Sequence, residues 1–211
     1  MSDGGKRMGV YGTSGSGKTT YVKKLVREMP RLVVFDPEEE YSDLPGMVTV
    51  DHPRRLGEIL DDCKDGHFRV AFVPEEGREE FDLDQVCKLV SQVQRPFLTG
   101  EHTLKTTLVV DELNLSFPLN WQPKFNQFAR ACSRGRKRGI NVIGVTQRPA
   151  EVGTRFRGNL NRVACFRLSV PNDWKVIRET MGPDAETAVR ELGQFSHVFW
   201  ENGDWKAVKP S

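Results

Sequence analysis

Residues 12–19 read Gly-Thr-Ser-Gly-Ser-Gly-Lys-Thr and fit the pattern G-x-x-x-x-G-K-[ST] at every fixed position. A short β-prone segment precedes this stretch at 7–11, and a helical pattern with apolar residues on one face follows over 20–29. A strand, a glycine-rich loop and a helix in this order let backbone N–H groups and the positive end of the helix dipole point at an anion. The alternative, a glycine-rich turn with a chance lysine, explains neither the spacing nor the flanking elements. The stretch therefore predicts a nucleotide-phosphate site.

The residue types in this loop predict individual roles. The Lys18 ammonium would reach the β- and γ-phosphates, and the Thr19 hydroxyl would ligate Mg²⁺. The predicted nucleotide contacts are Gly12, Thr13, Ser14, Gly15, Ser16, Gly17, Lys18, Thr19 and Thr20.

Length and composition limit the fold class. The 211 residues suit one α/β domain, and a mean hydropathy of −0.51 with 37% hydrophobic residues is typical of a soluble protein. No apolar run approaches the roughly 20 residues of a membrane span, and residues 1–6 lack a signal peptide's apolar core. The histidines show no ligand spacing, so no structural metal is expected. The cysteines are expected to be reduced core residues of a cytosolic protein: Cys63, Cys87, Cys132 and Cys165.

Charge is unevenly distributed, although the net charge is only +2. Residues 36–84 contain 16 acidic and 5 basic residues, whereas residues 121–170 contain 11 basic residues and one acidic residue, Glu151. Two solvated faces are the simplest explanation. The steepness of the second segment favours an anionic partner beyond the nucleotide, or the acidic face of a neighbouring subunit.

Two further strand ends carry polar side chains. A β-branched strand at 106–110 is followed by Asp111 and Glu112, and a strand at 140–146 is followed by Gln147. Parallel sheets bind ligands at the carboxyl ends of their strands, so Asp111 is predicted to hold Mg²⁺ and Glu112 to orient and deprotonate water. Gln147 would contact the γ-phosphate or the attacking water, or would merely cap the sheet.

The remaining periodicities predict an α/β fold: a three-layer nucleotide-binding domain with a mostly parallel sheet flanked by helices. One domain is expected over 1–211, with a core at about 7–170 and C-terminal helices and a β-hairpin at 171–211. A loop is expected at 113–123, and the hairpin would turn at Asn202-Gly203, a pair that suits a type I′ turn. Further strands are expected at 31–35, 47–50, 68–73 and 159–168, and helices at 54–63, 81–97, 124–133, 174–181 and 184–192.

Several stretches together resemble one family. Val-Phe-Asp-Pro at 34–37 is followed by Glu-Tyr at 40–41, the Asp-Glu pair ends the strand at 108–112, and a basic turn at 134–139 leads through a strand to Thr-Gln-Arg-Pro at 146–149. With the Asn-Arg-Val-Ala-Cys-Phe-Arg-Leu strand at 161–168, this set resembles the HerA/FtsK superfamily of P-loop DNA-translocating ATPases, of the RecA-like (ASCE) type. The similarity spans about residues 7–170. Because the chain is short and shows no N-terminal β-barrel or membrane segment, it is most similar to the genome-packaging ATPases of tailless, membrane-containing double-stranded DNA viruses.

This resemblance implies a function and partners. It implies hydrolysis of ATP with Mg²⁺, translocation of double-stranded DNA, and assembly into a homo-oligomeric, hexameric ring. Capsid or membrane-vertex proteins would be further partners, and the implied location is the cytoplasm of a host cell or the virion. DNA contacts would be sought first in loops 75–80 and 114–124 and in the basic 155–167 region.

The resemblance also implies that an arginine from a neighbouring subunit completes the ATP site. Arg136 is the first candidate and Arg134 the second, with Arg7 and Arg148 behind them. Any one of these side chains could instead form a salt bridge or contact a DNA phosphate.

Three other functions stay open from the sequence. A small nucleotide or metabolite kinase also carries a phosphate-binding loop, but it does not need a water-activating glutamate after the strand-end aspartate, so Glu112 and Gln147 favour hydrolysis. A HerA-like cellular or mobile-element translocase is poorly separated from a viral motor. A nucleotide-gated scaffold would bind ATP with negligible turnover.

Overall fold

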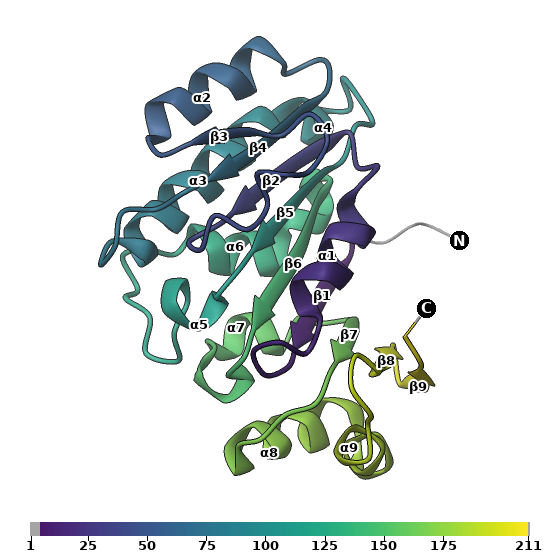
Figure 1. Cartoon of the computed structure of the whole chain (residues 1–211). Helices are drawn as coiled ribbons and strands as arrows, with labels where there is room; N and C mark the ends of the chain where they lie inside the picture. Colours follow the sequence, from purple (N-terminus) through teal and green to yellow (C-terminus); the bar gives the residue numbers. More distant parts are fainter. Residues whose placement is uncertain (1–4, 211) are drawn as a thin grey trace.

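The computed structural model describes residues 5–210 and contains, over that part of the chain, a nine-stranded sheet (Figure 1). The strand order is β3-β4-β2-β5-β6-β1-β7-β8-β9. The pairs from β3 to β7 are parallel, and β8 and β9 join antiparallel at one edge. The predicted mostly parallel sheet is thus confirmed. The strands are β1 Arg7–Tyr11, β2 Arg31–Phe35, β3 Val48–Val50, β4 Phe68–Phe72, β5 Thr106–Val110, β6 Ile140–Thr146, β7 Arg162–Cys165, β8 His197–Glu201 and β9 Asp204–Val208.

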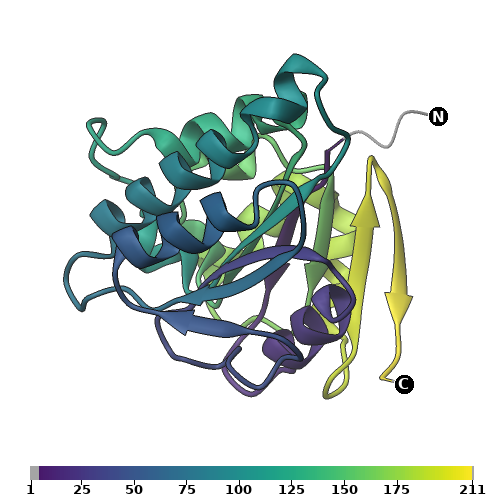
Figure 2. The same ribbon diagram turned by 90° about the horizontal axis from the view of Figure 1, so that it is seen from above.

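Helices cover both faces of the sheet, so the fold has the three predicted layers. In Figure 2 the blue and teal helices lie on one side of the sheet, and the purple helix α1 lies on the other. The sheet has a hydrophobic core on each face, and alternate strand residues pack into one or the other. Val33 and Phe35 of β2 face the larger helix layer, whereas Leu32 and Val34 face α1. The helices are α1 Lys18–Val26, α2 Pro53–Asp62, α3 Glu79–Val93, α4 Arg95–Thr99, α5 Leu113–Ser116, α6 Gln127–Arg134, α7 Thr154–Arg157, α8 Pro171–Met181 and α9 Pro183–Arg190, with 3-10 turns η1 Gly135–Arg138 and η2 Pro149–Glu151.

The central strands β1, β2 and β5 are buried along their whole length, as expected for a parallel sheet covered on both faces. Cys87, Cys132 and Cys165 are buried core residues as predicted, and Cys63 is half-buried. Along residues 5–210, every helix is too short or too polar to cross a membrane.

Four local predictions are wrong. The helix predicted over 81–97 is interrupted at Gln94, whose buried amide donates to the carbonyls of Leu104, Arg138 and Gly139. Those long-range bonds outweigh the helical periodicity of the segment. Leu25, expected on the buried face of α1, is 38% exposed and lines the groove beside that helix.

The loop predicted at 113–123 instead begins with the one-turn helix α5. Leu113 is fully buried, and a Cβ on Gly144 of β6 would lie 2.5 Å from both Leu113 Cδ2 and Phe156 Cζ. The missing side chain at Gly144 therefore makes the space into which α5 packs. The strand predicted at 159–168 is also shorter than expected, since only Arg162–Cys165 pair.

The C-terminal hairpin extends the same sheet. Asn202 and Gly203 connect β8 to β9, and both have positive φ angles, 51° and 106°. This is the backbone that a type I′ turn requires, so the prediction from the Asn-Gly pair is confirmed.

Candidate nucleotide site

The glycine loop joins β1 to α1 and is tied to the two strands beside β1. Gly12 N–H donates to the Thr146 carbonyl (3.3 Å) and Thr13 N–H to the Arg167 carbonyl (2.9 Å). A Cβ at Gly12 would lie 2.6 Å from both Phe166 Cβ and Ser16 Oγ, so only glycine fits there. Gly17, at φ 98°, precedes α1 in the left-handed region. The loop thus presents the start of α1 to the ligand space at the carboxyl edge of the sheet.

Lys18 lies over this loop. Its side chain is buried and Nζ donates to the Thr13 carbonyl at 3.0 Å. Burial lowers the pKa of Lys18, and the nearby carboxylates of Glu112, Asp111 and Glu40 oppose that shift. Residues from three separate segments therefore meet at one place, as the strand-end argument predicts.

Asp111 follows β5 and is 5% exposed. Its Oδ2 accepts a hydrogen bond from the Tyr41 hydroxyl and its Oδ1 accepts one from Glu112 N–H, both at 2.8 Å. Burial raises the pKa of Asp111 to about 6, while these two hydrogen bonds act to lower it. A cation beside the carboxylate would favour its charged form.

The residues present fit a magnesium ion. Mg²⁺ in nucleotide sites takes one or two protein oxygens and completes its shell with phosphates and water. The Thr19 hydroxyl and Asp111 supply such oxygens, and the buried Ser16 Oγ in the same loop has no hydrogen-bond partner among the described residues. A hydroxyl left in this way inside the loop suits a phosphate oxygen.

Asp36 positions Tyr41. This buried carboxylate ends β2, and its two oxygens accept hydrogen bonds from the N–H groups of Glu40 and Tyr41, each at 2.9 Å. The loop is thereby folded so that the Tyr41 ring is buried and its hydroxyl reaches Asp111. The Asp-Pro-x-x-Glu-Tyr stretch carried part of the family resemblance, but sequence reasoning assigned neither residue a place in the site. Both residues could have been predicted, because β2 and β5 are parallel and end at the same sheet edge, which places the segment after β2 beside Asp111.

Glu112 and Gln147 also meet. Gln147 Nε2 donates to Glu112 Oε1 at 2.9 Å, because β5 and β6 are neighbours and both residues follow their strand ends. Glu112 has φ 41° and ψ 51°, a left-handed conformation that costs roughly 1–3 kcal/mol for a residue other than glycine. Strained backbone of this kind occurs mainly at functional sites. The contact makes Gln147 more than a cap on the sheet, since it holds the carboxylate of Glu112.

Arg134 and Arg136 lie at the opposite, amino edge of the sheet. Both are exposed, at the end of α6 and in η1, just before β6 begins. The seven residues of β6 separate them from the glycine loop by roughly 20 Å. Neither side chain can reach the nucleotide of its own subunit, so either could act only on a neighbour.

The two weaker arginine candidates have structural partners. Arg7 is buried and donates to the carbonyls of Cys132, Ile140, Ala131 and Lys6, so its candidacy is wrong. Arg148 pairs with Glu151 at 2.7 Å and with the buried Asp173 at 3.3 Å. These contacts could not be predicted from the sequence, because most of the carbonyls and carboxylates come from distant segments of the chain.

Two hollows adjoin the glycine loop. A cavity of about 380 Å³ is lined by Thr13 to Ser16, Arg167 and residues 193–196. A groove of about 830 Å³ continues past Gly17 and Thr20 and is lined by rings, among them Tyr21, Phe166 and Phe195. Phe195 is half exposed with φ 61°, and a Cβ on Gly17 would lie 3.3 Å from its ring. Sequence reasoning missed Arg167 and Phe195 as site residues, since no local pattern places the C-terminal segment beside the loop.

Comparisons with known proteins agree with this geometry. The family model of the central domain of the helicase HerA matches residues 4–96, which include the glycine loop, Asp36 and Tyr41. A comparison with curated proteins finds no significant match.

Solved structures match along the chain. The genome packaging NTPase B204 from Sulfolobus turreted icosahedral virus 2, in complex with AMP, has a TM-score of 0.77 at 17% identity and covers 99% of both chains. VirB4 of Thermoanaerobacter pseudethanolicus has a TM-score of 0.68 at 12% identity, covering 97% of this chain and 89% of its own. EssC (ATPases 2 and 3) from Geobacillus thermodenitrificans has a TM-score of 0.61 at 11% identity and is covered over 39% of its length. The chain therefore has the fold of a P-loop ATPase, shared with the packaging NTPase B204 and with VirB4, and its resemblance to HerA is borne out by the family model over residues 4–96.

Proposed function

We propose that this chain hydrolyses ATP and uses the energy to move double-stranded DNA, as one subunit of a ring that packages a viral genome. The observation that carries the proposal is the pair of carboxylates after β5, with Asp111 buried under Tyr41 and Glu112 held by Gln147. A phosphotransferase needs the first carboxylate but not the second.

Each residue has a role in this reaction. The N–H groups of the glycine loop and the Lys18 ammonium offset the charge of the phosphates, and Thr19 and Asp111 hold Mg²⁺. When bound, the ion neutralises charge on the β- and γ-phosphates. Glu112 orients the attacking water and accepts its proton, and Gln147 keeps that carboxylate in place. An arginine of a neighbouring subunit, Arg136 or Arg134, stabilises the charge that develops on the γ-phosphate.

We place the nucleotide base in the aromatic groove. Thr20 and Gly17 line its near end, next to the phosphate loop, and the exposed ring of Phe195 offers a flat surface against which a base can stack. The polar cavity beside Arg167 would then hold phosphate oxygens. This arrangement puts the two ends of ATP in two chemically different hollows.

The comparisons support a packaging role over other forms of translocation. B204 is described as a genome packaging NTPase and a DNA-packaging ATPase, with structures in complex with AMP, ATP-gammaS and AMPPCP. The match covers 99% of this chain and 99% of B204. We therefore propose the packaging role of B204 for this chain as well. Capsid or membrane-vertex proteins would then be further partners, and the motor would act in the cytoplasm of a host cell or at the virion.

The second candidate function is that of a HerA-like cellular or mobile-element translocase. The match of residues 4–96 to the HerA central domain favours it. Both functions share the same ATPase chemistry and differ in partners, so a capsid-protein gene beside this one would favour packaging and a nuclease gene would favour repair.

The testing experiment measures phosphate release by the purified protein with and without double-stranded DNA. We expect DNA to stimulate hydrolysis. Glu112→Gln should lower the rate by about 10²–10⁴-fold, the usual contribution of a general base, while nucleotide still binds. Glu179→Gln, an exposed carboxylate on α8, is the matched control and should keep the wild-type rate. Transfer of phosphate to a nucleoside monophosphate, without release of free phosphate, would contradict the proposal.

A further inference from the structure

Six basic side chains surround two adjoining cavities along α6. The first cavity, of about 270 Å³, lies between α3, α6 and η1, and the second, of about 350 Å³, lies between α6 and α7. Arg130 and Arg134 of α6 line both, and no aspartate or glutamate lines either. We call this set the α6 basic strip: Lys88, Arg95, Arg130, Arg134, Arg138 and Arg155.

These six charges have no carboxylate partner within residues 5–210. The contrast with the rest of the surface is sharp, because most other arginines are paired. The arginines that contact a carboxylate include Arg54, Arg55, Arg78, Arg148, Arg162, Arg178 and Arg190.

The strip has an energetic cost in the free protein. Arg130 and Arg134 lie one turn apart on α6, and like charges at that spacing destabilise a helix. Arg95 lies between the end of the 15-residue α3 and the start of the five-residue α4, so the two helix dipoles act on its charge in opposite directions. A bound anion would remove the repulsion between Arg130 and Arg134.

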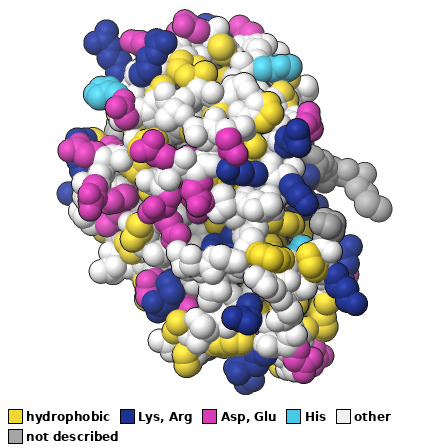
Figure 3. Space-filling view, viewed as in Figure 1, with side chains coloured by type: hydrophobic (Ala, Val, Ile, Leu, Met, Phe, Trp, Pro, Cys, Tyr) yellow, Lys and Arg dark blue, Asp and Glu magenta, His cyan; other side chains and the backbone are white. Residues whose placement is uncertain are grey.

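The strip cannot serve the nucleotide of its own subunit. The first cavity includes Gly135 and Ile140 at the start of β6, the sheet edge opposite the glycine loop. The face in Figure 3 carries α1 and mixes acidic with basic side chains. The strip belongs instead to the α3–α6 layer, on the other side of the sheet.

We propose that the α6 basic strip binds the phosphates of a double-stranded DNA backbone, which leaves Arg136, the first candidate, to act on the nucleotide of a neighbouring subunit. This inference rests on the proposed function, since it locates the DNA. Six cations spread over four helices, the turn η1 and two cavities suit a polymer of phosphates better than the single triphosphate of a neighbouring subunit. The other lining side chains include the amides Gln92, Gln127 and Asn126, a residue type that can hydrogen-bond to phosphate oxygens.

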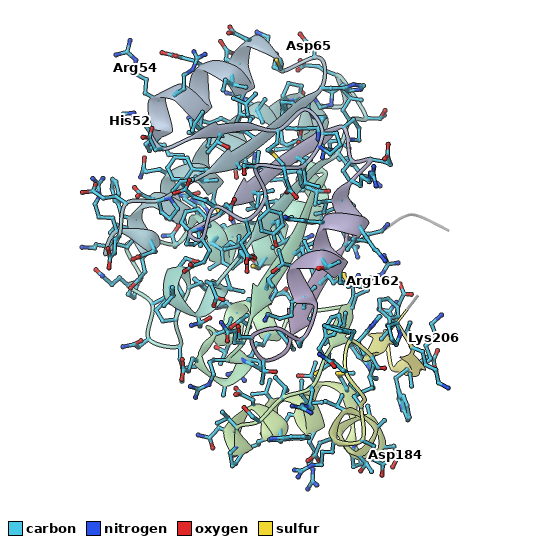
Figure 4. All side chains as sticks on the ribbon, viewed as in Figure 1. His52, Arg54, Asp65, Arg162, Asp184 and Lys206 are labelled. Atoms are coloured by element: carbon cyan, nitrogen blue, oxygen red, sulfur yellow. The ribbon has the colours of Figure 1, made fainter. Side chains whose placement is uncertain are left out.

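The test compares two triple variants of equal charge in the full-length protein. The strip variant is Lys88→Gln, Arg95→Gln, Arg130→Gln, which leaves Arg134 and Arg136 unchanged. The control variant is Arg54→Gln, Arg55→Gln, Lys175→Gln, three exposed side chains that each pair with a carboxylate. Arg54 projects from α2 at the far end of the molecule from the C-terminal helices (Figure 4). Thermal unfolding checks that both variants fold, and the single variants Arg95→Gln and Arg130→Gln serve if the triple does not.

Binding of a fluorescent 30-base-pair duplex is followed by anisotropy across a range of salt concentrations. We expect the strip variant to bind at least about ten-fold more weakly at 0.1 M salt, with a salt slope smaller by about three, one for each phosphate contact removed. The control should stay within about two-fold of wild type, and duplexes of different base composition should bind alike because phosphate contacts carry no sequence information.

The rate of ATP hydrolysis measured without DNA shows whether the strip binds DNA phosphates or the phosphates of a neighbouring subunit's nucleotide. If the strip binds DNA, the strip variant keeps the wild-type rate in the absence of DNA and loses the stimulation by DNA. Unchanged DNA affinity with a lost DNA-independent rate would overturn the inference and assign the strip to a neighbour's nucleotide. An affinity equal to that of the control would overturn it too, while DNA-stimulated hydrolysis by wild type would leave the proposed function standing. A wild-type protein that binds no duplex would refute both.

Discussion

The two carboxylates after β5 differ in surroundings although they are adjacent in the chain. Asp111 is buried, its pKa is raised to about 6, and both its oxygens accept hydrogen bonds. Glu112 is half-buried and contacts Gln147 across the strand ends. Environments that separate two carboxyl groups in this way allow one to hold a cation and the other to accept a proton.

Tyr41 is the residue whose loss tests the Asp111 environment. Tyr41→Phe removes the donor to Asp111 Oδ2 and keeps the ring packed in the core. Loss of a partner that orients a metal ligand typically costs 10–100-fold in metal affinity or activity, so we expect the apparent affinity for Mg²⁺ in the ATPase assay to fall by about that factor.

Tyr11→Phe is the matched control for this substitution. Tyr11 is also fully buried in the core, and its hydroxyl has no hydrogen-bond partner among the described residues. Equal Mg²⁺ dependence in Tyr41→Phe and wild type would show that the 2.8 Å contact has no part in holding the cation.

At the scale of elements, Arg7 joins three pieces of the fold. Its guanidinium donates to the carbonyls of Ala131 and Cys132 in the last turn of α6 and to that of Ile140 at the start of β6. Gly135 N–H also donates to the Ala131 carbonyl, so Arg7 from β1 adds a second donor there and caps the end of α6 together with that backbone bond. Burial lowers the pKa of Arg7, but an arginine stays charged throughout the physiological range.

Arg7→Met should therefore destabilise the protein without touching the nucleotide. The substitution removes the side-chain donor of the Cys132 and Ile140 carbonyls, whereas the Ala131 carbonyl keeps the Gly135 N–H. Each buried carbonyl left without a donor costs about 1–3 kcal/mol, so the free energy of unfolding should fall by roughly 3 kcal/mol. For a chain of this length that corresponds to a loss of about 10 °C in the midpoint of thermal unfolding. Arg27→Met, an exposed arginine after α1, should change the midpoint little. A shift no larger than that of the control would show that water replaces Arg7 as the donor.

At the scale of the whole molecule, the residues of the proposed site lie at two opposite edges of the sheet. Lys18, Asp111, Glu112 and Gln147 lie at the carboxyl edge, and Arg134 and Arg136 lie at the amino edge. A neighbour that presents its amino edge to this carboxyl edge makes a head-to-tail contact, and such contacts close into rings when the rotation permits.

Mixing two inactive variants tests this arrangement. Lys18→Ala removes the phosphate contact but keeps Arg136, whereas Arg136→Ala keeps the phosphate loop. If Arg136 acts on the neighbour, each variant alone loses most activity, and an equal mixture recovers about a quarter of the wild-type rate because that fraction of interfaces has both residues. The measurement is phosphate release against mixing ratio, with Arg134→Ala mixed in the same way. Absence of recovery in both mixtures, with each single variant inactive, would exclude a shared site.

The sequence by itself determined which residues gather at the carboxyl edge of the sheet. The glycine pattern, the Asp-Glu pair and Gln147 each follow a β-rich stretch, and in a parallel sheet the ends of such strands share one edge. The strand β1, the hairpin turn at Asn202-Gly203 and the mostly parallel sheet followed for the same reason, since backbone requirements and periodicity are local properties of the chain.

Only the tertiary structure decided which side chains support that site. Tyr41 lies 70 residues before Asp111, and Arg7 contacts carbonyls more than 120 residues away. The break at Gln94 and the unpaired charges of the α6 basic strip likewise depend on segments distant in sequence. A local pattern states what a residue can do, but hydrogen bonds, burial and ion pairs depend on which distant segments the packed core brings beside it.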